Sequence, residues 1–393
     1  MFQLKLCFVD SGPMDYTAES PYVMPLGGSQ SALCYLTAAL AERGHAVCLL
    51  NNTSTPGIFR GVECLTLPEE PEELFSNRTF DAVISLNSLL PMSTIRPHLP
   101  PNTPLLLWTQ HTAEDVSMLA LQHRLVQEAW DSFVFVSRWQ QANYIQRFGL
   151  QPERTCIRRN AIAPAFAYLF ADKAQLVSAK AKTPTLAYTP VPNRGLAVLL
   201  DIFPLLREIF PQLQLEVFSS LQTYQEPEDD PTLQALYQRC RETENVNLRG
   251  SLPQPELALE LSKAHLLAYP NTFAETSCIA AMEAMACGCD IITTQMGALP
   301  ETTAGFARLV PPQPHENYAR RYLSALTDAL MLWLKDPQAV VDRLSNQVMH
   351  TSRRNTWPVR IWEWESLLFQ RCRNPNQDYW PEGLPRVKTQ VQP

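Results

Sequence analysis

The chain has 393 residues, a formal net charge of −7 and a pI of about 5.6. With 46% hydrophobic, 9% aromatic and 18% charged residues, its composition excludes a mainly disordered chain, a collagen and a coiled coil. The negative charge disfavours nucleic acid as the main partner, because phosphate binding needs a basic face. The length predicts two or three domains.

The sequence indicates a cytoplasmic protein. No segment approaches the roughly 18 uncharged apolar residues that a membrane span needs. Residues 1–10 lack the charged and apolar regions of a secretory signal, and they predict a buried first strand. The ten cysteines are scattered, and the closest pair, Cys287 and Cys289, lacks the spacing of a zinc or redox motif. These features favour a reducing compartment.

The first half of the chain alternates between strand-like and helix-like patterns. Apolar periodicity predicts helices at 29–43 and across 121–130. Short apolar runs predict strands at 4–9, 46–50, 82–85, 104–108 and 133–136. This alternation implies a parallel sheet with helices on both faces.

A second alternation follows, with helices at 197–210 and 277–286. Its strands are expected at 185–188, 213–218, 266–269 and 290–294. The predicted fold is α/β, with Rossmann-like, doubly wound domains at 1–165 and 166–356. Their changeover lies near 160–181, and an amphipathic helix at 357–373 precedes a polar, proline-rich tail at 374–393. Such domains bind ligands in a central cleft at the carboxyl ends of their strands.

Two glycines, Gly27 and Gly28, stand between the first predicted strand and its helix. Glycines let a ligand approach the backbone, and a helix N-terminus offers unpaired N–H groups to an anion such as a diphosphate. The preceding loop, 10–26, is long for such a connection, which favours a function. The alternative is a merely flexible helix entry.

Two carboxylates mark the segment 273–288. Glu275 is expected at the helix start, beside the N–H groups of Thr276, Ser277 and Cys278. Glu283 follows two turns along, about 12 Å up the axis. A carboxylate inside an apolar helix is costly unless it accepts hydrogen bonds, and the vicinal hydroxyls of a sugar or ribose are suitable donors. Alternatively, Glu283 caps a neighbouring backbone group.

This segment resembles the Glu-x7-Glu motif of retaining nucleotide-sugar glycosyltransferases with the GT-B fold, and most of all glycosyltransferase family four, also called group 1. The resemblance runs from about residue 4 to 365. Further similar motifs are Gly27-Gly28, Arg43-Gly44-His45-Ala46-Val47, Val136-Ser137-Arg138-Trp139, Arg159-Asn160-Ala161-Ile162, Pro270-Asn271-Thr272, the run 284–292 and Gly297-Ala298-Leu299-Pro300-Glu301.

The chain departs from the family pattern at two places. Thr189 replaces the usual Arg after the first strand of the second domain, while Arg194 stands at the position of the usual Lys. A single cation is therefore expected at the donor diphosphate, and Arg can hold phosphate oxygens bidentately. The run Thr276-Ser277-Cys278 replaces the usual Gly-Phe-Gly and makes a bulkier loop.

The resemblance implies a retaining glycosyltransferase of the hexosyltransferase type. It places the acceptor on the first domain and the donor on the second. The diphosphate is expected between Gly28 and Arg194, the sugar near Glu275 and His111, and the ribose at Glu283. The helix N-terminus is expected to stabilise the leaving diphosphate through Thr276, Ser277, Cys278 and Ile279. The resemblance also implies that the helix at 357–373 crosses back to the first domain.

His111 follows an apolar strand, so it should face the cleft, and the family carries a functional His at a similar place, near the transferred sugar. The resemblance makes His111 a catalytic residue, with Glu275 and Arg194. The alternative is a solvent-facing loop residue. Asp115 is expected either to bind hydroxyls of donor or acceptor or to cap the helix that follows it.

The remaining expectations concern partners. Asp229-Asp230 is followed by proline in a polar loop, and no Asp-x-Asp metal motif stands in the expected place, so neither a cofactor nor an obligatory metal is predicted. The family favours UDP over GDP in the donor. The acceptor, a glycan, a lipid or a small molecule, is not identified, and a lipid-linked one would bring the chain to a membrane surface. Two alternatives stay open: a GT-B nucleotide-sugar 2-epimerase and a non-catalytic nucleotide-sugar binder.

Overall fold

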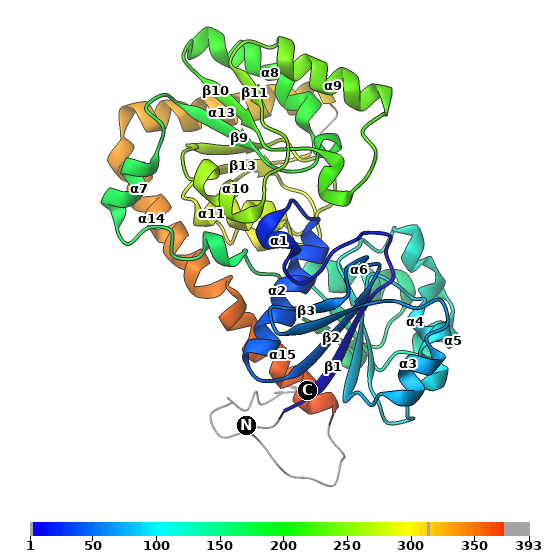
Figure 1. Cartoon of the computed structure of the whole chain (residues 1–393). Coiled ribbons are helices and arrows are strands. Elements are labelled where there is room, and N and C mark those ends of the chain that lie inside the picture. Colours follow the sequence, from blue (N-terminus) through cyan, green and yellow to red (C-terminus); the bar gives the residue numbers. More distant parts are fainter. Residues whose placement is uncertain (1–2, 313–314, 373–393) are drawn as a thin grey trace, which may run out of the picture.

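A computed structural model of the chain describes residues 3–312 and 315–372 (Figure 1). It contains two α/β domains, drawn in blue to cyan and in green to yellow, one above the other. Each is built on its own parallel sheet with helices on both sides, as the sequence predicts. No helix in the described ranges is long and apolar enough to cross a membrane.

The first sheet has eight strands in the order β3-β4-β2-β1-β5-β6-β7-β8. All pairs are parallel except β3 with β4, which is an antiparallel edge pair that the sequence did not predict. Its central strands are continuously apolar because both faces are covered; all five residues of β6 are buried. The strand bounds are β1 Lys5–Asp10, β2 Ala46–Asn51, β3 Gly57–Phe59, β4 Val62–Thr66, β5 Ala82–Leu86, β6 Leu105–Thr109, β7 Ser132–Phe135 and β8 Thr155–Ile157.

The second sheet is entirely parallel and has six strands in the order β11-β10-β9-β12-β13-β14. The parallel strands of each sheet run in the same direction, so their carboxyl ends share one edge. The bounds are β9 Thr185–Tyr188, β10 Gln214–Val217, β11 Val246–Leu248, β12 Leu266–Tyr269, β13 Asp290–Thr294 and β14 Arg308–Val310.

The helices of the first domain are α1 Ser20–Val23, α2 Gly28–Glu42, α3 Glu72–Asn77, α4 Pro91–Thr94, α5 Arg124–Glu128 and α6 Arg138–Phe148. Those that follow are α7 Lys173–Ala179, α8 Leu196–Ile209, α9 Pro231–Glu242, α10 Gln254–Leu261, α11 Ile279–Ala286, α12 Leu299–Thr302, α13 His315–Lys335, α14 Pro337–Arg354 and α15 Trp357–Arg371. The remaining short turns are 3-10 helices, among them η2 Val116–Gln122 and η5 Pro192–Arg194.

Two helix predictions were wrong. The helix expected across 121–130 is instead η2 followed by the short α5, with His123 in an extended conformation between them. The helix expected at 277 begins only at Ile279, because Cys278 adopts a left-handed backbone conformation with φ 39°. A non-glycine residue in that region cannot continue an α-helix.

The last described helix, α15, packs on the first domain beside α2 (Figure 1). The Trp364 ring lies edge-on to those of Phe8 and Trp108, with centroids 6.5 and 5.0 Å away. The buried Glu365 carboxylate pairs with Arg43. The chain therefore returns to the first domain after completing the second. The predicted tail at 374–393 lies outside the described residues.

Candidate functional site

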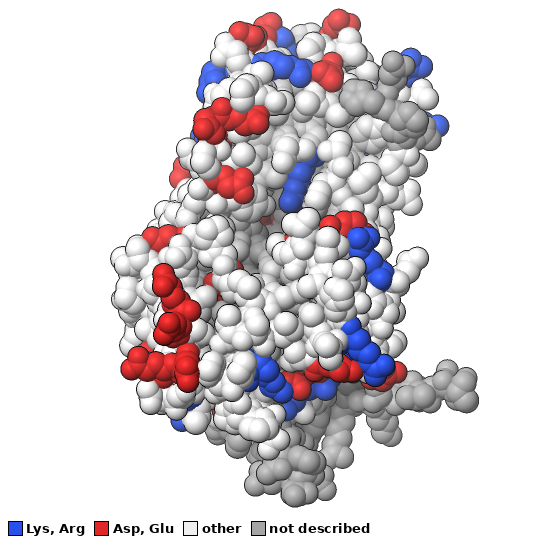
Figure 2. Space-filling view, turned by 90° about the vertical axis from the view of Figure 1, so that its right-hand side faces the viewer, with Lys and Arg blue, Asp and Glu red and all other residues white. Residues whose placement is uncertain are grey.

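A cavity of about 1150 Å³ separates the two domains. Residues that follow β1, β5 and β6 line it from the first domain, and residues that follow β9 and β12 line it from the second. The space-filling view shows the surface hollowed where the domains meet (Figure 2). The cavity therefore occupies the place where doubly wound sheets bind ligands.

Glu275 lies in the loop between β12 and α11, and its buried side chain lines the cavity. Its Oε1 accepts hydrogen bonds from Arg194 Nη1 at 2.9 Å and Tyr269 Oη at 2.7 Å. The loop is fastened by the 297–301 motif, since Ala298 N donates to the Glu275 carbonyl. A Cβ at Gly297 would stand 2.4 Å from that carbonyl, so only glycine fits there.

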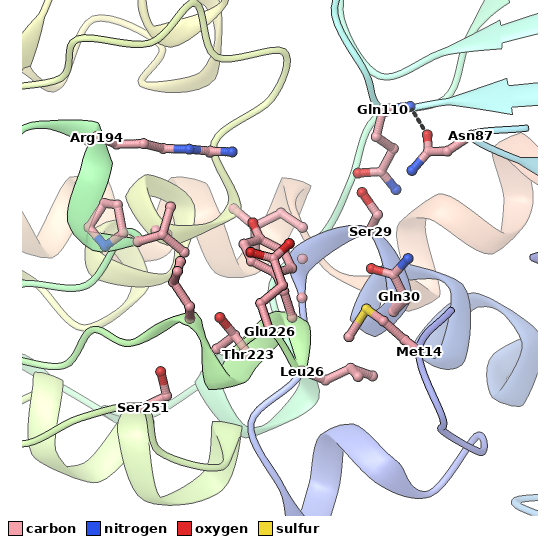
Figure 3. Close-up of a pocket in the computed structure, with 18 of the residues that line it drawn as sticks. Met14, Leu26, Ser29, Gln30, Asn87, Gln110, Arg194, Thr223, Glu226 and Ser251 are labelled. Atoms are coloured by element: carbon pink, nitrogen blue, oxygen red, sulfur yellow. Dashed lines mark hydrogen bonds between the residues drawn. The ribbon is translucent and has the colours of Figure 1, made fainter. Parts of the chain in front are cut away.

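Arg194 ends η5, directly before α8. It reaches into the space between the domains (Figure 3), where its guanidinium also stacks on Phe273, 4.2 Å from the ring centroid. Burial acts to lower the pKa of Arg194, but the Glu275 carboxylate raises it above its usual value. Gly195, with φ 123°, lets this turn pass against the carbonyl of Pro270. A permanent cation is thereby fixed beside Glu275.

Glu283 lies in α11, is 4% exposed and lines the cavity. Burial raises its pKa to about 8, and a hydrogen bond from the Ala163 backbone offsets part of that effect. The two sequence-based interpretations therefore meet in one residue, which bonds a neighbouring backbone group and also faces the cavity. At neutral pH this side chain is largely protonated, so it can both donate and accept hydrogen bonds.

The segment 276–279 lines the cavity, although only Ile279 belongs to α11. The N–H groups of Thr276, Ser277 and Cys278 are thus not the helix N-terminus that the sequence predicted, and Glu275 stands four residues before the first helical residue. Thr276 Oγ1 donates to the Gln110 carbonyl of the first domain at 2.7 Å. The bulkier loop therefore ties the two domains together beside the cavity.

The two glycines at the start of α2 also line the cavity. A Cβ at Gly27 would stand 2.8 Å from the Tyr224 ring of the second domain, while one at Gly28 would lie 3.5 Å from Ile279. The absence of a side chain at Gly27 therefore lets the two domains approach each other closely. The N-terminus of α2 lies at the cavity.

His111 and Asp115 follow β6 and line the cavity together. His111 Nδ1 lies 3.1 Å from Ser117 Oγ and 3.5 Å from Asp115 Oδ2. Burial lowers the pKa of His111, although Asp115 opposes this, so the ring is neutral at neutral pH. Asp115 caps η2 by accepting from Ser117 N at 2.9 Å, as one of the two interpretations proposed, and it also faces the cavity.

Other lining residues of the first domain were not predicted. Asp10 ends β1, is buried, and accepts hydrogen bonds from Tyr16 Oη at 2.7 Å and Gln30 Nε2 at 3.1 Å. A carboxylate directly after a buried apolar strand was a signal that could have been noticed. The amides Gln30, Asn87, Gln110 and Asn160 come from four separate segments, and only Asn160 lies in one of the family-like motifs, Arg159-Asn160-Ala161-Ile162.

Three of these amides form one chain of hydrogen bonds. Asn87 Oδ1 accepts from Gln110 N at 2.6 Å (Figure 3), and Asn160 Nδ2 donates to Gln110 Oε1 at 2.7 Å. Asn160 is 1% exposed, and its own carbonyl accepts from Arg360 Nε of α15. The last helix therefore supports the wall of the cavity.

The charges around the cavity are unequal. Among the described residues that line it, Arg194 is the only Lys or Arg, whereas the acidic ones are Asp10, Asp115, Glu226, Glu275 and Glu283. In residues 3–312 and 315–372, no group of three or more His, Cys, Asp or Glu residues is arranged to hold a metal ion.

Comparison with known proteins agrees with this arrangement. Residues 185–328, within the second domain, match the family model described as Glycosyl transferases group 1. A search of the curated proteins gave no match. The resemblance to group 1 glycosyltransferases that the sequence predicts is thereby confirmed.

Solved structures share the fold over nearly the whole chain. Sucrose-phosphate synthase from Thermosynechococcus elongatus is 18% identical, with a TM-score of 0.66, and the match covers 93% of this chain and 98% of that one. HepE from Anabaena, in complex with UDP and glucose, is 16% identical at a TM-score of 0.66, covering 94% and 100%. A glycosyltransferase from Rickettsia africae is 11% identical at a TM-score of 0.70, covering 94% and 99%. The predicted GT-B fold is confirmed.

Proposed function

We propose that this chain, a glycosyltransferase of the group 1 type, transfers a sugar from a UDP-sugar to an acceptor hydroxyl with retention of the anomeric configuration. The observation that carries the proposal is the pairing of Arg194 with Glu275 at the cavity, which the buried Glu283 also lines. One structurally similar protein, HepE, was crystallised with UDP and glucose, which supports UDP as the donor nucleotide to test first.

The second domain would hold the donor. Arg194 would contact the diphosphate, because it is the lining cation and its guanidinium has further N–H donors beside the one given to Glu275. Glu283 would accept hydrogen bonds from the ribose hydroxyls and donate hydrogen bonds to them. Glu275 would orient the hydroxyls of the transferred sugar, with His111 on the opposite wall as a neutral hydrogen-bonding group.

In the proposed reaction, the bond between the anomeric carbon and the diphosphate oxygen breaks, and its electron pair leaves on the diphosphate. Arg194 stabilises that developing charge. The acceptor oxygen attacks the same face of the oxocarbenium-like sugar, and its proton passes to the departing phosphate oxygen. The residues of this chain thus bind, orient and neutralise, without a covalent intermediate.

The proposal is tested by incubating the protein with a panel of UDP-, GDP- and ADP-sugars and measuring nucleotide release with and without a mixture of sugar, glycan and lipid acceptors. We expect release from a UDP-sugar that rises with acceptor, and NMR of the new glycosidic bond should show the donor's anomeric configuration. Release of UDP together with a 2-epimeric sugar would instead identify an epimerase. Binding without release would identify a nucleotide-sugar binder.

The same assay with and without a chelator tests whether a metal is required. We propose that transfer needs no metal, and so expect the rate to be unchanged by EDTA. If EDTA lowers the rate and added Mg²⁺ or Mn²⁺ restores it, only the proposal that no metal is needed is contradicted. That result would mean that the five carboxylates around one cation need a counter-charge.

A further inference from the structure

The first-domain wall of the cavity has an unusual polar character. Its described lining residues include Asp10 and Asp115 but no lysine or arginine. The nearby guanidinium of Arg159 is not among the lining residues and pairs with Glu301 at 2.6 Å. An anionic group that entered this side would meet two carboxylates and no compensating cation.

Two buried atoms on this wall lack a hydrogen-bond partner. They are Gln110 Nε2, a donor, and Asn160 Oδ1, an acceptor, and both residues line the cavity. Leaving a buried donor and acceptor unpaired costs free energy, so the pair calls for a ligand. Exchanging the orientation of both amides would still leave one donor and one acceptor.

A hydroxyl satisfies such a pair, because it donates one hydrogen bond and accepts others. An ionised phosphate or carboxylate only accepts, so it would bond Gln110 and leave Asn160 unpaired. The backbones of both residues are already held in place, because Arg360 donates to the Asn160 carbonyl and Asn87 accepts from Gln110 N. Their side-chain amides bond each other, since Asn160 Nδ2 donates to Gln110 Oε1. The wall is thus prepared for hydroxyls before any ligand arrives.

We propose that the acceptor side of the cavity, the first-domain wall, selects a neutral polyol and rejects its phosphorylated or carboxylated forms. Gln110 and Asn160 receive one acceptor hydroxyl between them, and Asp10 and Asp115 supply the charge that excludes anions. This inference rests on the proposed function, since it assigns the acceptor for the same cavity.

The experiment uses the full chain saturated with UDP and measures the binding of matched pairs by calorimetry and saturation-transfer NMR. The pairs are glucose and glucose phosphate, fructose and fructose phosphate, and glycerol and glycerol phosphate. We expect a neutral member to bind at least about tenfold more tightly than its phosphate. Equal or tighter binding of a phosphate, or no binding by any neutral member, would overturn the inference.

Two variants locate the effect. Gln110→Glu keeps the size of the side chain but replaces the unpaired donor with an acceptor, so binding of the neutral sugar should fall about tenfold or more while UDP affinity is kept. The control, Gln122→Glu, makes the same change on an exposed residue outside the cavity. Asp115→Asn, at a half-exposed residue, should reduce the difference in binding affinity between each neutral sugar and its phosphate.

The failures can be told apart. If UDP does not bind the unmodified chain, the proposed function fails. If UDP binds but the phosphates are preferred, only the acceptor assignment fails. If Gln110→Glu and Asp115→Asn leave both affinities unchanged, neutral sugars bind elsewhere and the subsite is wrong.

Discussion

The two walls of the cavity differ in how they hold charge. On the second-domain wall, Arg194, Glu275 and Tyr269 form one buried hydrogen-bonded cluster, with the Glu283 carboxyl close by in α11. On the first-domain wall, amide side chains predominate among the described residues and the carboxylates of Asp10 and Asp115 have no lining cation beside them. One wall suits an anionic leaving group, and the other suits hydroxyls.

This difference shows that the cavity cannot be understood from its net charge. With five carboxylates and one guanidinium, the whole cavity would repel a nucleoside diphosphate. The guanidinium is, however, fixed at one place, and burial keeps Glu283 largely protonated near neutral pH. The local arrangement therefore leaves the second-domain wall less negative than a count of residues indicates.

The largest expected effect concerns the proton on Glu283. Burial raises its pKa from 4.5 in a model peptide to about 8 in the folded chain. Between these pH values the unfolded chain binds fewer protons than the folded one, so Glu283 lowers the stability of the fold as pH rises. The loss should reach about 4–5 kcal/mol by pH 8 and then level off.

Urea unfolding of the unmodified chain and of Glu283→Gln, at pH 5 and pH 8, measures this effect. The variant, which cannot ionise there, should gain stability relative to the unmodified chain as pH rises. The control Glu128→Gln alters an exposed residue of α5 and should show no such trend. A pH-independent difference between Glu283→Gln and the unmodified chain would show that Glu283 is ionised throughout, and the second-domain wall would be more negative than argued.

The second expected effect is on donor binding. Removing the guanidinium in Arg194→Ala should weaken UDP binding by about 1.5–3 kcal/mol, the scale of a hydrogen bond to a charged group. It would also leave the buried Glu275 carboxylate without its partner. Calorimetry with UDP measures the loss, and Arg239→Ala, an exposed arginine of α9 paired with Asp201, is the control. Unchanged affinity would place the diphosphate elsewhere and remove the contrast between the walls.

The same contrast explains what the sequence could predict. Glu275 and Glu283 belong to one continuous motif of the second domain, so their spacing singled them out. Arg194 lies outside that motif, and the resemblance to the family pattern singled it out. The first-domain wall is assembled from the ends of separate strands. Asn87, Gln110 and Asn160 are distant in sequence and meet only because β5, β6 and β8 belong to one sheet. Asn160 lies in a family-like motif, but no local pattern indicates that the three residues meet at one wall.

The central strands of both sheets and the helices α2, α8 and α15 could be predicted, because apolar runs and helical periodicity are local. The start of α11 could not, since the left-handed conformation of Cys278 depends on the packing of its loop. The helix expected at 121–130 failed for a related reason: its apolar residues Leu121 and Trp130 are both buried, but Leu121 lies in η2 and Trp130 follows the end of α5. Tertiary packing decided the conformation at both places.

A smaller effect distinguishes the two carboxylates of the second-domain wall. If Glu275 orients the transferred sugar, Glu275→Gln should weaken the UDP-sugar or lower its turnover by about 1 kcal/mol, the net worth of a hydrogen bond, while UDP affinity stays the same. Glu283→Gln should weaken UDP and UDP-sugar alike. Calorimetry with both ligands on both variants measures this. Equal losses for both ligands in both variants would refute the division of roles.

The smallest expected effect concerns how the two walls are held together. Glu301 of α12, in the second domain, accepts from Arg138 N at 2.9 Å at the start of α6 and pairs with Arg159 at 2.6 Å. On the opposite side of the cavity, Gln225 exchanges hydrogen bonds with the backbone of Asp15. These contacts join the two domains across the cavity, and hinge folds of this kind commonly open and close around their ligand.

The ion pair between Glu301 and Arg159 is partly exposed. Its removal should therefore destabilise the closed arrangement of the domains by less than about 1 kcal/mol. That is enough to shift a balanced equilibrium between open and closed forms by several fold. Glu301→Ala should therefore increase the radius of gyration of the UDP-free chain in small-angle scattering, and saturating UDP should reverse the increase. Glu128→Ala, far from the cavity, serves as the control. Identical scattering from Glu301→Ala and the unmodified chain, each measured with and without UDP, would mean that the remaining contacts hold the cleft closed by themselves. The two walls would then form one rigid site, and the acceptor would have to enter through the opening that the closed structure already has.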